Sequence, residues 1–501
     1  MTPVSYACYT YRNFSALEIE TLRMADLINN HPDRLLPGDR NARSVARRLY
    51  FEVKDLPIIS PHGHTDPAWF AENNSFSDPT KLLIAPDHYL LRMLYSQGIR
   101  LSELGIRSKN NDKNEESIND PRSAWRLFAK NYYLFRGTPS ALWLNQTFAD
   151  FFKQSKELDE TTADDYFDSI SEQLQKDEYR PRQIFDRFNI EFLSTTESAI
   201  DNLKYHQILR DSDWNGKVVT TYRPDSVIDP EHPDFIKSLR LFGEMTGQDT
   251  HSWQGYLQAH RNRRANFIAL GATSSDHGHP TPRTANLSTA NCERLFNRII
   301  ARKISPEDAE LFRAQMLTEM ARMSLDDKLV MQIHTGSYRN HNEWMYQNYG
   351  GDKGADIPVQ VEYSTALKPL LDCFGNNPDL SLILFTLDET NYSRELAPLA
   401  GHYPCLRLGP AWWFNDSPEG IMRFREQTTE TAGFYNTVGF NDDTRALLSI
   451  PARHDMSRRV DCSYLARLVC EHRLSEHDAV QTAKDLTYNL PKKAYRIGDD
   501  K

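Results

Sequence analysis

The sequence predicts an α/β protein built on a closed (β/α)8 barrel of the TIM type, and three observations support this prediction. Short apolar segments rich in β-branched residues recur along the 501 residues, eight in all, each followed by a helix-like or charged stretch. Strands that alternate with helices pair in parallel, because each crossover carries the chain back along the sheet. Polar side chains gather where these segments end, which is where such a barrel holds its active site. The expected strands cover residues 56–64, 190–198, 217–225, 267–277, 329–337, 380–388, 405–413 and 436–445.

Two parts of the chain fall outside this alternation. The N-terminal part is expected to be a helical extension, and the stretch after the first strand is expected to be a large helical insertion, because its apolar spacing suits amphipathic helices packed on the barrel. The charged stretch 107–122 is expected to be a solvated loop. The predicted organisation is an extension over 1–55, the first strand with its site loop over 56–71, the insertion over 72–185, and the remaining barrel with C-terminal helices over 186–501.

Composition narrows the class of protein. No stretch approaches the roughly 18 to 20 consecutive apolar residues of a membrane span, and the N-terminus lacks the layout of a signal peptide, so a cytoplasmic protein without a membrane partner is expected. The six cysteines form no CxxC pair, which suits reduced thiols and a metal site without sulfur ligands. A net charge of -10 argues against nucleic-acid binding. An anionic substrate would therefore need local arginines.

The first predicted strand ends in the sequence His-Gly-His. Alternate side chains of an extended strand point the same way, so His62 and His64 can converge on one divalent metal ion. Asp66 adds a carboxylate on the same side. Imidazole suits several metals, so this pair alone names none of them. The alternative that the residues leave open is a pair of loop histidines bonded to backbone.

The other predicted strands also end in residues that can carry chemistry. The carboxyl ends of parallel strands meet at one edge of a barrel, so these side chains are expected to share one site. They are His62, His64, Arg223, Asp225, Asp276, His277, His334, Trp412, Trp413, Asp442, Asp443 and Arg445.

Longer motifs resemble a known family. A His-x-His at the first barrel strand with an aspartate at the last resembles the amidohydrolase superfamily. The motifs "DHYLLRML", "TTYRPD", "SDHGH", "MQIHTGSYRNHN", "GPAWWFND" and "NDDTRALLSIPARHDMSRR" resemble uronate isomerase, in one order from about residue 25 to residue 495. They cover residues 87–94, 220–225, 275–279, 331–342, 409–416 and 441–459.

The resemblance implies an aldose-ketose isomerase. Such enzymes interconvert hexuronates, D-glucuronate with D-fructuronate or D-galacturonate with D-tagaturonate, by moving a proton between C2 and C1. The resemblance implies one divalent metal ion, with zinc the expected identity, and no nicotinamide, flavin or nucleotide; no glycine-rich phosphate fingerprint follows any predicted strand. It implies that Asp443, Tyr89, His88 and Arg445 are catalytic, and that His62, His64 and Asp443 hold the metal.

The substrate is expected to meet a further set of residues. Tyr89 lies among arginines, so a lowered pKa is expected for its phenol. One of the two tryptophans is expected to face the core and the other to stack on sugar, and His334 is a possible further metal contact. His277 could bind metal, bind substrate or support the strand ends. The expected substrate-binding residues are Arg223, Trp412, Trp413, His277 and His334, and a homo-oligomer is expected.

Two other function classes stay open from the sequence. A metal-dependent hydrolase of the same superfamily would use Asp443 to activate a metal-bound water, but the sixth predicted strand ends "LFTLDETN" without the histidine that a two-metal hydrolase wants. The second class is a sugar-acid binding protein without catalytic activity. The presence of side chains that can act as general acid and base argues against this class.

Overall fold

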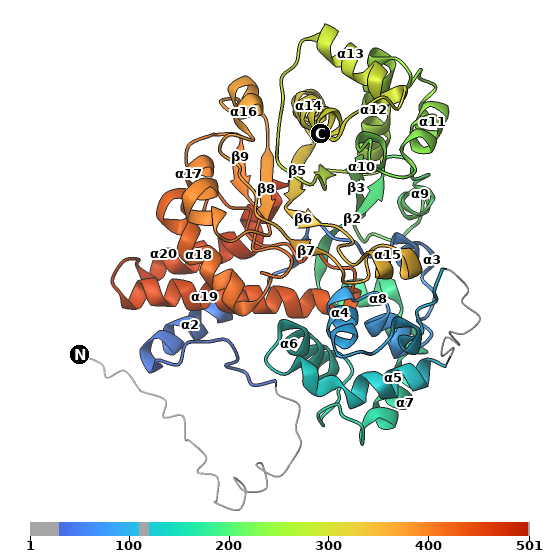
Figure 1. The fold of residues 1–501 in the computed structure, drawn as a ribbon. Coiled ribbons are helices and arrows are strands. Elements are labelled where there is room, and N and C mark those ends of the chain that lie inside the picture. The colour runs from blue at the N-terminus through green and yellow to red at the C-terminus, as the bar shows by residue number, and fades with distance from the viewer. Residues whose placement is uncertain (1–29, 110–119, 499–501) are drawn as a thin grey trace, which may run out of the picture.

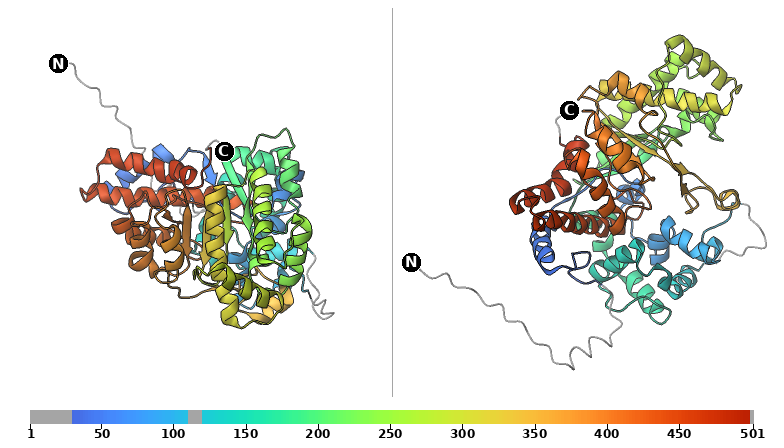
Figure 2. Two further views of the ribbon diagram at one scale, coloured as in Figure 1. Left: turned by 90° about the horizontal axis from the view of Figure 1, so that it is seen from above. Right: turned by 60° about the vertical axis from the view of Figure 1, so that its left-hand side comes forward.

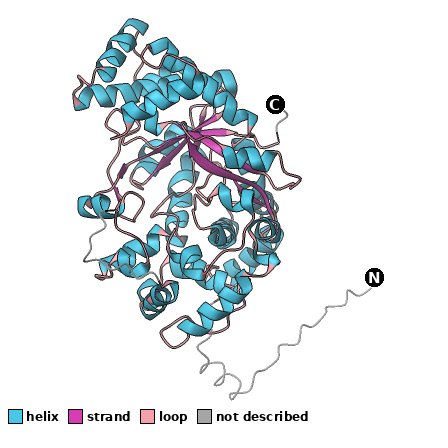
Figure 3. Cartoon of the chain, turned by 90° about the vertical axis from the view of Figure 1, so that its right-hand side faces the viewer, coloured by secondary structure: helices cyan, strands magenta, loops and turns pink. Residues whose placement is uncertain are grey.

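The computed structural model describes residues 30–109 and 120–498, and its centre is a curled parallel sheet (Figure 1). Seven strands lie in the order β1-β2-β3-β4-β5-β8-β9, each parallel to its neighbour. Parallel neighbours need crossovers, and helices supply them around the strands (Figure 3). The predicted barrel-type α/β fold is confirmed. The strands are β1 (Ile58–Ser60), β2 (Ile190–Ser198), β3 (Val218–Arg223), β4 (Ser274–His277), β5 (Val330–Thr335), β8 (Leu382–Thr386) and β9 (Leu406–Leu408).

The eighth predicted strand, 436–445, is reduced to one bridge. Thr437 pairs in parallel with Leu408, and the Val438 N–H donates to the Leu408 carbonyl at 3.0 Å. The extended backbone ends at Gly439, whose φ of 77° lies in the left-handed region that favours glycine. The rest of this segment is therefore irregular, and it supplies a loop of the site.

The fourth predicted strand, 267–277, was placed too early. Its first residues belong to α12 (Trp253–Ala269), where Phe267 is fully buried on the helix side of the sheet. Gly271, at φ 90°, follows the helix in the left-handed conformation typical of a helix end. Only the last four residues of the predicted segment form β4.

The predicted helical insertion contains helices between β1 and β2, and the described residues there form no strand. Their side chains make an apolar core of their own, with Trp125, Phe128 and Tyr166 among its buried members. Figure 2 shows these blue and teal helices on the other side of the molecule from the green and yellow ones, which run from α11 (Phe235–Thr246) to α14 (Pro306–Asp327). Residues 110–119 of the predicted charged loop lie outside the described residues. The helices are α3 (Pro67–Glu72), α4 (His88–Ser96), α5 (Pro121–Lys130), α6 (Pro139–Gln146), α7 (Ala163–Leu174) and α8 (Pro181–Arg187).

The N-terminal extension is described only from residue 30, so the helix expected before that point lies outside the described part. Its α2 (Arg40–Val53) buries Ala46 and Leu49 against α19 (Ile450–Cys470) and α20 (Glu476–Lys484). No helix of the described ranges is long and apolar enough to cross a membrane. The other helices are α9 (Lys204–Arg210), α10 (Asp225–Ile228), α11 (Phe235–Thr246), α13 (Thr289–Ile300), α14 (Pro306–Asp327), α15 (Glu343–Tyr349), α16 (Lys368–Phe374), α17 (Ala397–Ala400), α18 (Pro418–Ala432) and α21 (Leu490–Ala494).

A polar layer inside the barrel supports the site. The Ser194 and Thr221 hydroxyls lie 2.8 Å apart, and Thr221 lies 3.1 Å from Ser274. Gln332 donates to Ser274, and its amide oxygen accepts from the Tyr495 hydroxyl at 2.9 Å. Because every second residue of a strand points inward, neighbouring strands place these small polar groups at one level.

Candidate active site

A pocket of about 220 Å³ opens at the carboxyl ends of the strands. This volume is below the range typical of drug-sized ligands and suits a small polar molecule. The strand ends, the loop after β9, the loop after Thr437 and the start of α4 all contribute side chains. The lining residues are His62, His64, Pro86, Asp87, His88, Tyr89, Thr196, Arg223, His334, Arg339, Asp352, Ala411, Trp412, Trp413, Asp416, Asn441, Asp442, Asp443, Thr444, Arg445, Ala446 and Arg453.

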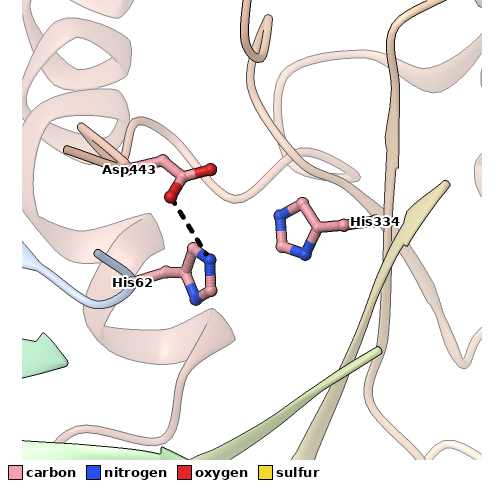
Figure 4. Close-up of side chains that lie close together, drawn as sticks. All are labelled: His62, His334 and Asp443. Atoms are coloured by element: carbon pink, nitrogen blue, oxygen red, sulfur yellow. Dashed lines mark ion pairs between the residues drawn. The ribbon is translucent and has the colours of Figure 1, made fainter. Parts of the chain in front are cut away.

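Three side chains meet at the floor of this pocket (Figure 4). One ligand atom each from His62, His334 and Asp443 lies within 4.8 Å of the others. The His62 Nε2 and His334 Nε2 atoms are buried without a hydrogen-bond partner among the described residues, which is costly unless a ligand binds them. Two imidazoles and a carboxylate fit a divalent metal ion. The His64 Nε2 atom lies 3.1 Å from Asp443 Oδ1, so the three predicted metal ligands do come together, with His334 beside them.

The imidazole of His334 is fixed from behind. Its Nδ1 lies 2.5 Å from Asp276 Oδ1, and the second oxygen of Asp276 lies 3.1 Å from the Arg223 guanidinium. A carboxylate accepts the Nδ1–H of histidine and so directs the Nε2 lone pair toward the pocket. Although burial alone would raise the pKa of Asp276, Arg223 and His334 hold it well below the usual range. His62 has a weaker support, since its Nδ1 lies 3.3 Å from the amide nitrogen of Gln332.

The carboxylate of Asp443 is held in a strained position. Its backbone has a φ of 39°, which a side chain other than glycine rarely adopts. The Trp412 indole N–H donates to Oδ2 at 2.5 Å, and the Oδ1 atom faces the imidazoles of His62 and His64. Although burial alone would raise the pKa of Asp443, these imidazoles hold it well below the usual range. The group is therefore an ionised carboxylate at ordinary pH.

The start of α4 brings His88 and Tyr89 over the floor. Asp87 caps this helix, because its side chain accepts from the Tyr89 N–H at 2.9 Å. His88 stacks on Trp413 with ring centres 5.1 Å apart, and burial lowers the pKa of its imidazole to about 3. His88 is thus a neutral side chain in the pocket wall.

The predicted lowering of the Tyr89 pKa is wrong. Burial of the phenol and the Asp416 carboxylate raise this pKa well above the ordinary value, and the Arg453 cation only partly opposes them. The Tyr89 O–H donates to Asp416 Oδ1 at 2.6 Å and accepts from the Phe414 N–H at 2.8 Å. Since a hydrogen bond from phenol to carboxylate favours the neutral phenol, Tyr89 enters the site with its proton.

Some predicted residues lie elsewhere than expected. His277 is fully buried but is absent from the pocket lining, because β4 points Asp276 inward and the next residue outward; its Nε2 lies 3.2 Å from Ser275 Oγ. This geometry does not fit the predicted substrate contact. Asp66 caps α3 instead of facing the metal ligands.

Both tryptophans line the pocket, and both also belong to a buried apolar cluster that includes Phe385 and Val438. Trp412 packs edge-on against His334 with ring centres 4.7 Å apart, and Trp413 stacks on His88. Each indole therefore forms part of the wall around the catalytic candidates.

The pocket also contains residues that sequence reasoning did not single out. Arg339 and Asp416 lie inside two of the quoted motifs, which were the available signal, whereas Asp352 lies in none of them. Arg223 and Arg445, the two predicted clamps, both reach the pocket. Each is paired with a carboxylate of the protein.

Comparisons with known proteins identify the family of this chain. The sequence model of a family described as glucuronate isomerase matches residues 40–495. A uronate isomerase of Phenylobacterium zucineum is 66% identical, over 94% of this chain and 97% of that protein. The crystal structure of glucuronate isomerase from Caulobacter crescentus matches with a TM-score of 0.93 and 61% identity, over 95% of this chain and 98% of that one. A uronate isomerase structure from Thermotoga maritima matches with a TM-score of 0.86 and 25% identity, over 93% and 99%. The chain belongs to the glucuronate isomerase family.

Proposed function

We propose that this enzyme interconverts hexuronic aldoses and their 2-keto isomers, D-glucuronate with D-fructuronate and D-galacturonate with D-tagaturonate. The observation that carries the proposal is the pocket floor, where one ionised carboxylate faces buried imidazoles beneath a wall that bears arginines. Family membership over residues 40–495 supports the same activity. The pocket is small, which suits a single sugar acid.

Arg445 is proposed to bind the substrate carboxylate. Its guanidinium lines the pocket two residues after Asp443, so the clamp and the carboxylate come from one loop. A guanidinium can hold a carboxylate through two parallel hydrogen bonds, which fixes orientation as well as charge. Arg223 is a weaker candidate for this contact, because Asp225 and Asp276 both bind it.

Asp443 is proposed to carry the proton between the carbon atoms. In the open-chain aldose the C2 proton lies beside the C1 carbonyl, so its removal leaves an enediolate rather than an isolated carbanion. The carboxylate takes the proton as the C2–H bond breaks and returns it as the C1–H bond forms. Trp412 keeps the carboxylate in place through its N–H.

The oxygen atoms need a second proton transfer. Conversion of an aldose to a ketose removes the proton from O2 and places one on O1. His88 and Tyr89 are proposed to hold and move this proton, because both are neutral side chains that can donate and accept. Tyr89 receives its orientation from Asp416 and from the backbone of Phe414.

A divalent metal ion is proposed to bind at the pocket floor, with zinc the expected identity. His62, His334 and Asp443 would hold it, and His64 lies near enough to Asp443 to take part. When bound, such an ion places positive charge beside an oxygen that becomes anionic during the reaction. No nicotinamide, flavin or nucleotide is expected to be needed.

The enzyme is also proposed to be a cytoplasmic homo-oligomer. Among the described residues the cysteines are free, which suits a reducing compartment. Several large apolar side chains are exposed in one segment after β5, including Tyr338, Trp344 and Tyr346, and such a patch favours association with another copy.

One assay separates the isomerase from the metal-dependent hydrolase. The protein is incubated with D-glucuronate or D-galacturonate and tested for ketose, and in parallel with sugar amides and esters and tested for new acid. Ketose without added cofactor is the expected result. New acid without any ketose would favour the hydrolase, which the residues after β8 (Leu382–Thr386) disfavour because the chain continues with Leu387 and Asp388 and no histidine.

A further inference from the structure

Each arginine in the lining of the pocket already has a carboxylate partner. A substrate carboxylate must therefore displace one of these partners before it gains a guanidinium of its own. The pairs among the described residues are Arg223 with Asp276 at 3.1 Å, Arg339 with Asp356 at 3.1 Å, Arg445 with Asp352 at 3.0 Å and Arg453 with Asp416 at 2.6 Å.

The pairs differ in how easily they separate. Asp276 is 0% exposed, Asp356 4% and Asp416 12%, so their release would leave a charge in a dry environment. Arg445 and Asp352 are 35% and 44% exposed. Water can solvate the carboxylate that leaves this pair, so it is the least costly of the four to break.

Asp352 lies outside the regular secondary structure. The residue lies between α15 (Glu343–Tyr349) and β7 (Ile357–Pro358), and Gly350 and Gly354 flank it with φ of 85° and 78°. Glycine adopts these conformations without steric cost, and no strand or helix includes the aspartate. The carboxylates of Asp276, Asp356 and Asp416 are more buried, and the Asp356 carboxylate also accepts a hydrogen bond from the Asn340 backbone N–H.

We propose that Asp352 is the resident counter-ion of Arg445 and that the substrate carboxylate displaces it. The inference rests on the proposed function, because it assigns Arg445 to the uronate carboxylate. It implies that Asp352 weakens the binding of every anion at Arg445 by a similar factor. The ratio of the affinities for hexuronate and phosphate therefore stays the same, while the occupancy of the pocket by a small inorganic anion is lower than it would be at an unpaired arginine.

The test replaces Asp352 with Asn. Asparagine tolerates the positive φ of 59° at this position and removes only the charge. The KM for D-glucuronate should fall about two- to fivefold, the upper part of the range expected for loss of a half-exposed ion pair, with kcat within about twofold. The inhibition constant of inorganic phosphate should fall by a similar factor. Asp352→Gly provides a second variant with the same expected direction.

Two controls separate this role from general effects. Glu476→Gln breaks an ion pair with Arg48 of comparable exposure on the remote helix α20 and should change neither constant. In an Arg445→Met background, Asp352→Asn should have no further effect on KM, because the aspartate acts through that arginine.

Three results would overturn the inference. A KM that rises in Asp352→Asn would place the aspartate on a sugar hydroxyl instead. Unchanged KM and unchanged phosphate inhibition would show that the pair does not compete with substrate. Full additivity with Arg445→Met would mean that Asp352 acts elsewhere. If the wild type makes no ketose, the proposed function fails, and calorimetric titration of both proteins with phosphate alone still decides whether Asp352 competes at Arg445.

Discussion

Replacing Asp443 with Asn tests the proposed proton carrier. The amide keeps the shape of the carboxylate and can still accept from the Trp412 indole N–H, which lies 2.5 Å from Oδ2 in the wild type. It removes the negative charge that lies 3.4 Å from His62 Nε2 and 3.1 Å from His64 Nε2. The substitution therefore separates the charge and basicity of the group from its packing.

The expected loss follows from what the group does in the reaction. A positioned general base contributes about 10²- to 10⁴-fold to the rate, which corresponds to a lowering of the activation free energy by about 2.7 to 5.4 kcal/mol. Asp443 also supplies the negative member of the group His62, His334 and Asp443. Because both functions are lost together, kcat/KM should fall by several orders of magnitude.

The assay measures ketose formation from D-glucuronate by the wild type, by Asp443→Asn and by wild type treated with a chelator, with metal content determined for each. Chelated wild type should keep measurable turnover, since the open-chain aldehyde already activates the C2 proton. Activity of Asp443→Asn within tenfold of wild type would refute the role of the carboxylate. If chelation abolishes activity as fully as the substitution does, and added divalent metal restores it, the claim that the Asp443 carboxylate matters more for activity than the metal ion would be refuted.

Three further predictions follow from the same site. Arg445→Met should lower kcat/KM about a hundredfold, on the order of 3 kcal/mol, and wild-type kinetics would show that the arginine points elsewhere. Tyr89 is held neutral by burial and Asp416, so Asp416→Asn should shift the alkaline limb of the pH-rate profile to lower pH; an unmoved limb would contradict this. Burial raises the pKa of Glu197 from 4.5 to about 8, so the folded state holds this proton more tightly than the unfolded state does. The free energy of unfolding should therefore decline as pH rises from about 4.5 to about 8, by about 1.4 kcal/mol per pH unit from this group. Glu197→Gln should remove that slope in urea unfolding at several pH values, and an unchanged slope would exclude the assignment.

The sequence was sufficient for the barrel because its evidence is local. Apolar, β-branched segments and the helices between them are visible in short windows, and the alternation of a strand places His62 and His64 on one side without any tertiary information. The fourth and eighth segments were less regular than expected. Gly271 follows the end of a helix inside the fourth segment, and Gly439 ends the extended backbone inside the eighth.

The remaining errors concern facts that one sequence does not contain. Asp276 and His277 are neighbours, and which of them faces the barrel interior depends on the register of β4 with β3 and β5. The pKa of Tyr89 depends on Asp416, which is 327 residues away along the chain. Long-range pairs of this kind set the charge of a site, so the residue types were predictable and their protonation was not.

The central claim is that the enzyme moves hydrogen between C1 and C2 of a hexuronate without a redox cofactor. The most direct measurement is a 13C NMR time course of D-glucuronate labelled at C1, with the purified protein and divalent metal alone. The label should leave the aldose signals and appear as the primary alcohol carbon of a 2-ketose. A label that stays in the aldose with folded, metal-loaded protein, or that moves only when a nicotinamide is added, would contradict the account.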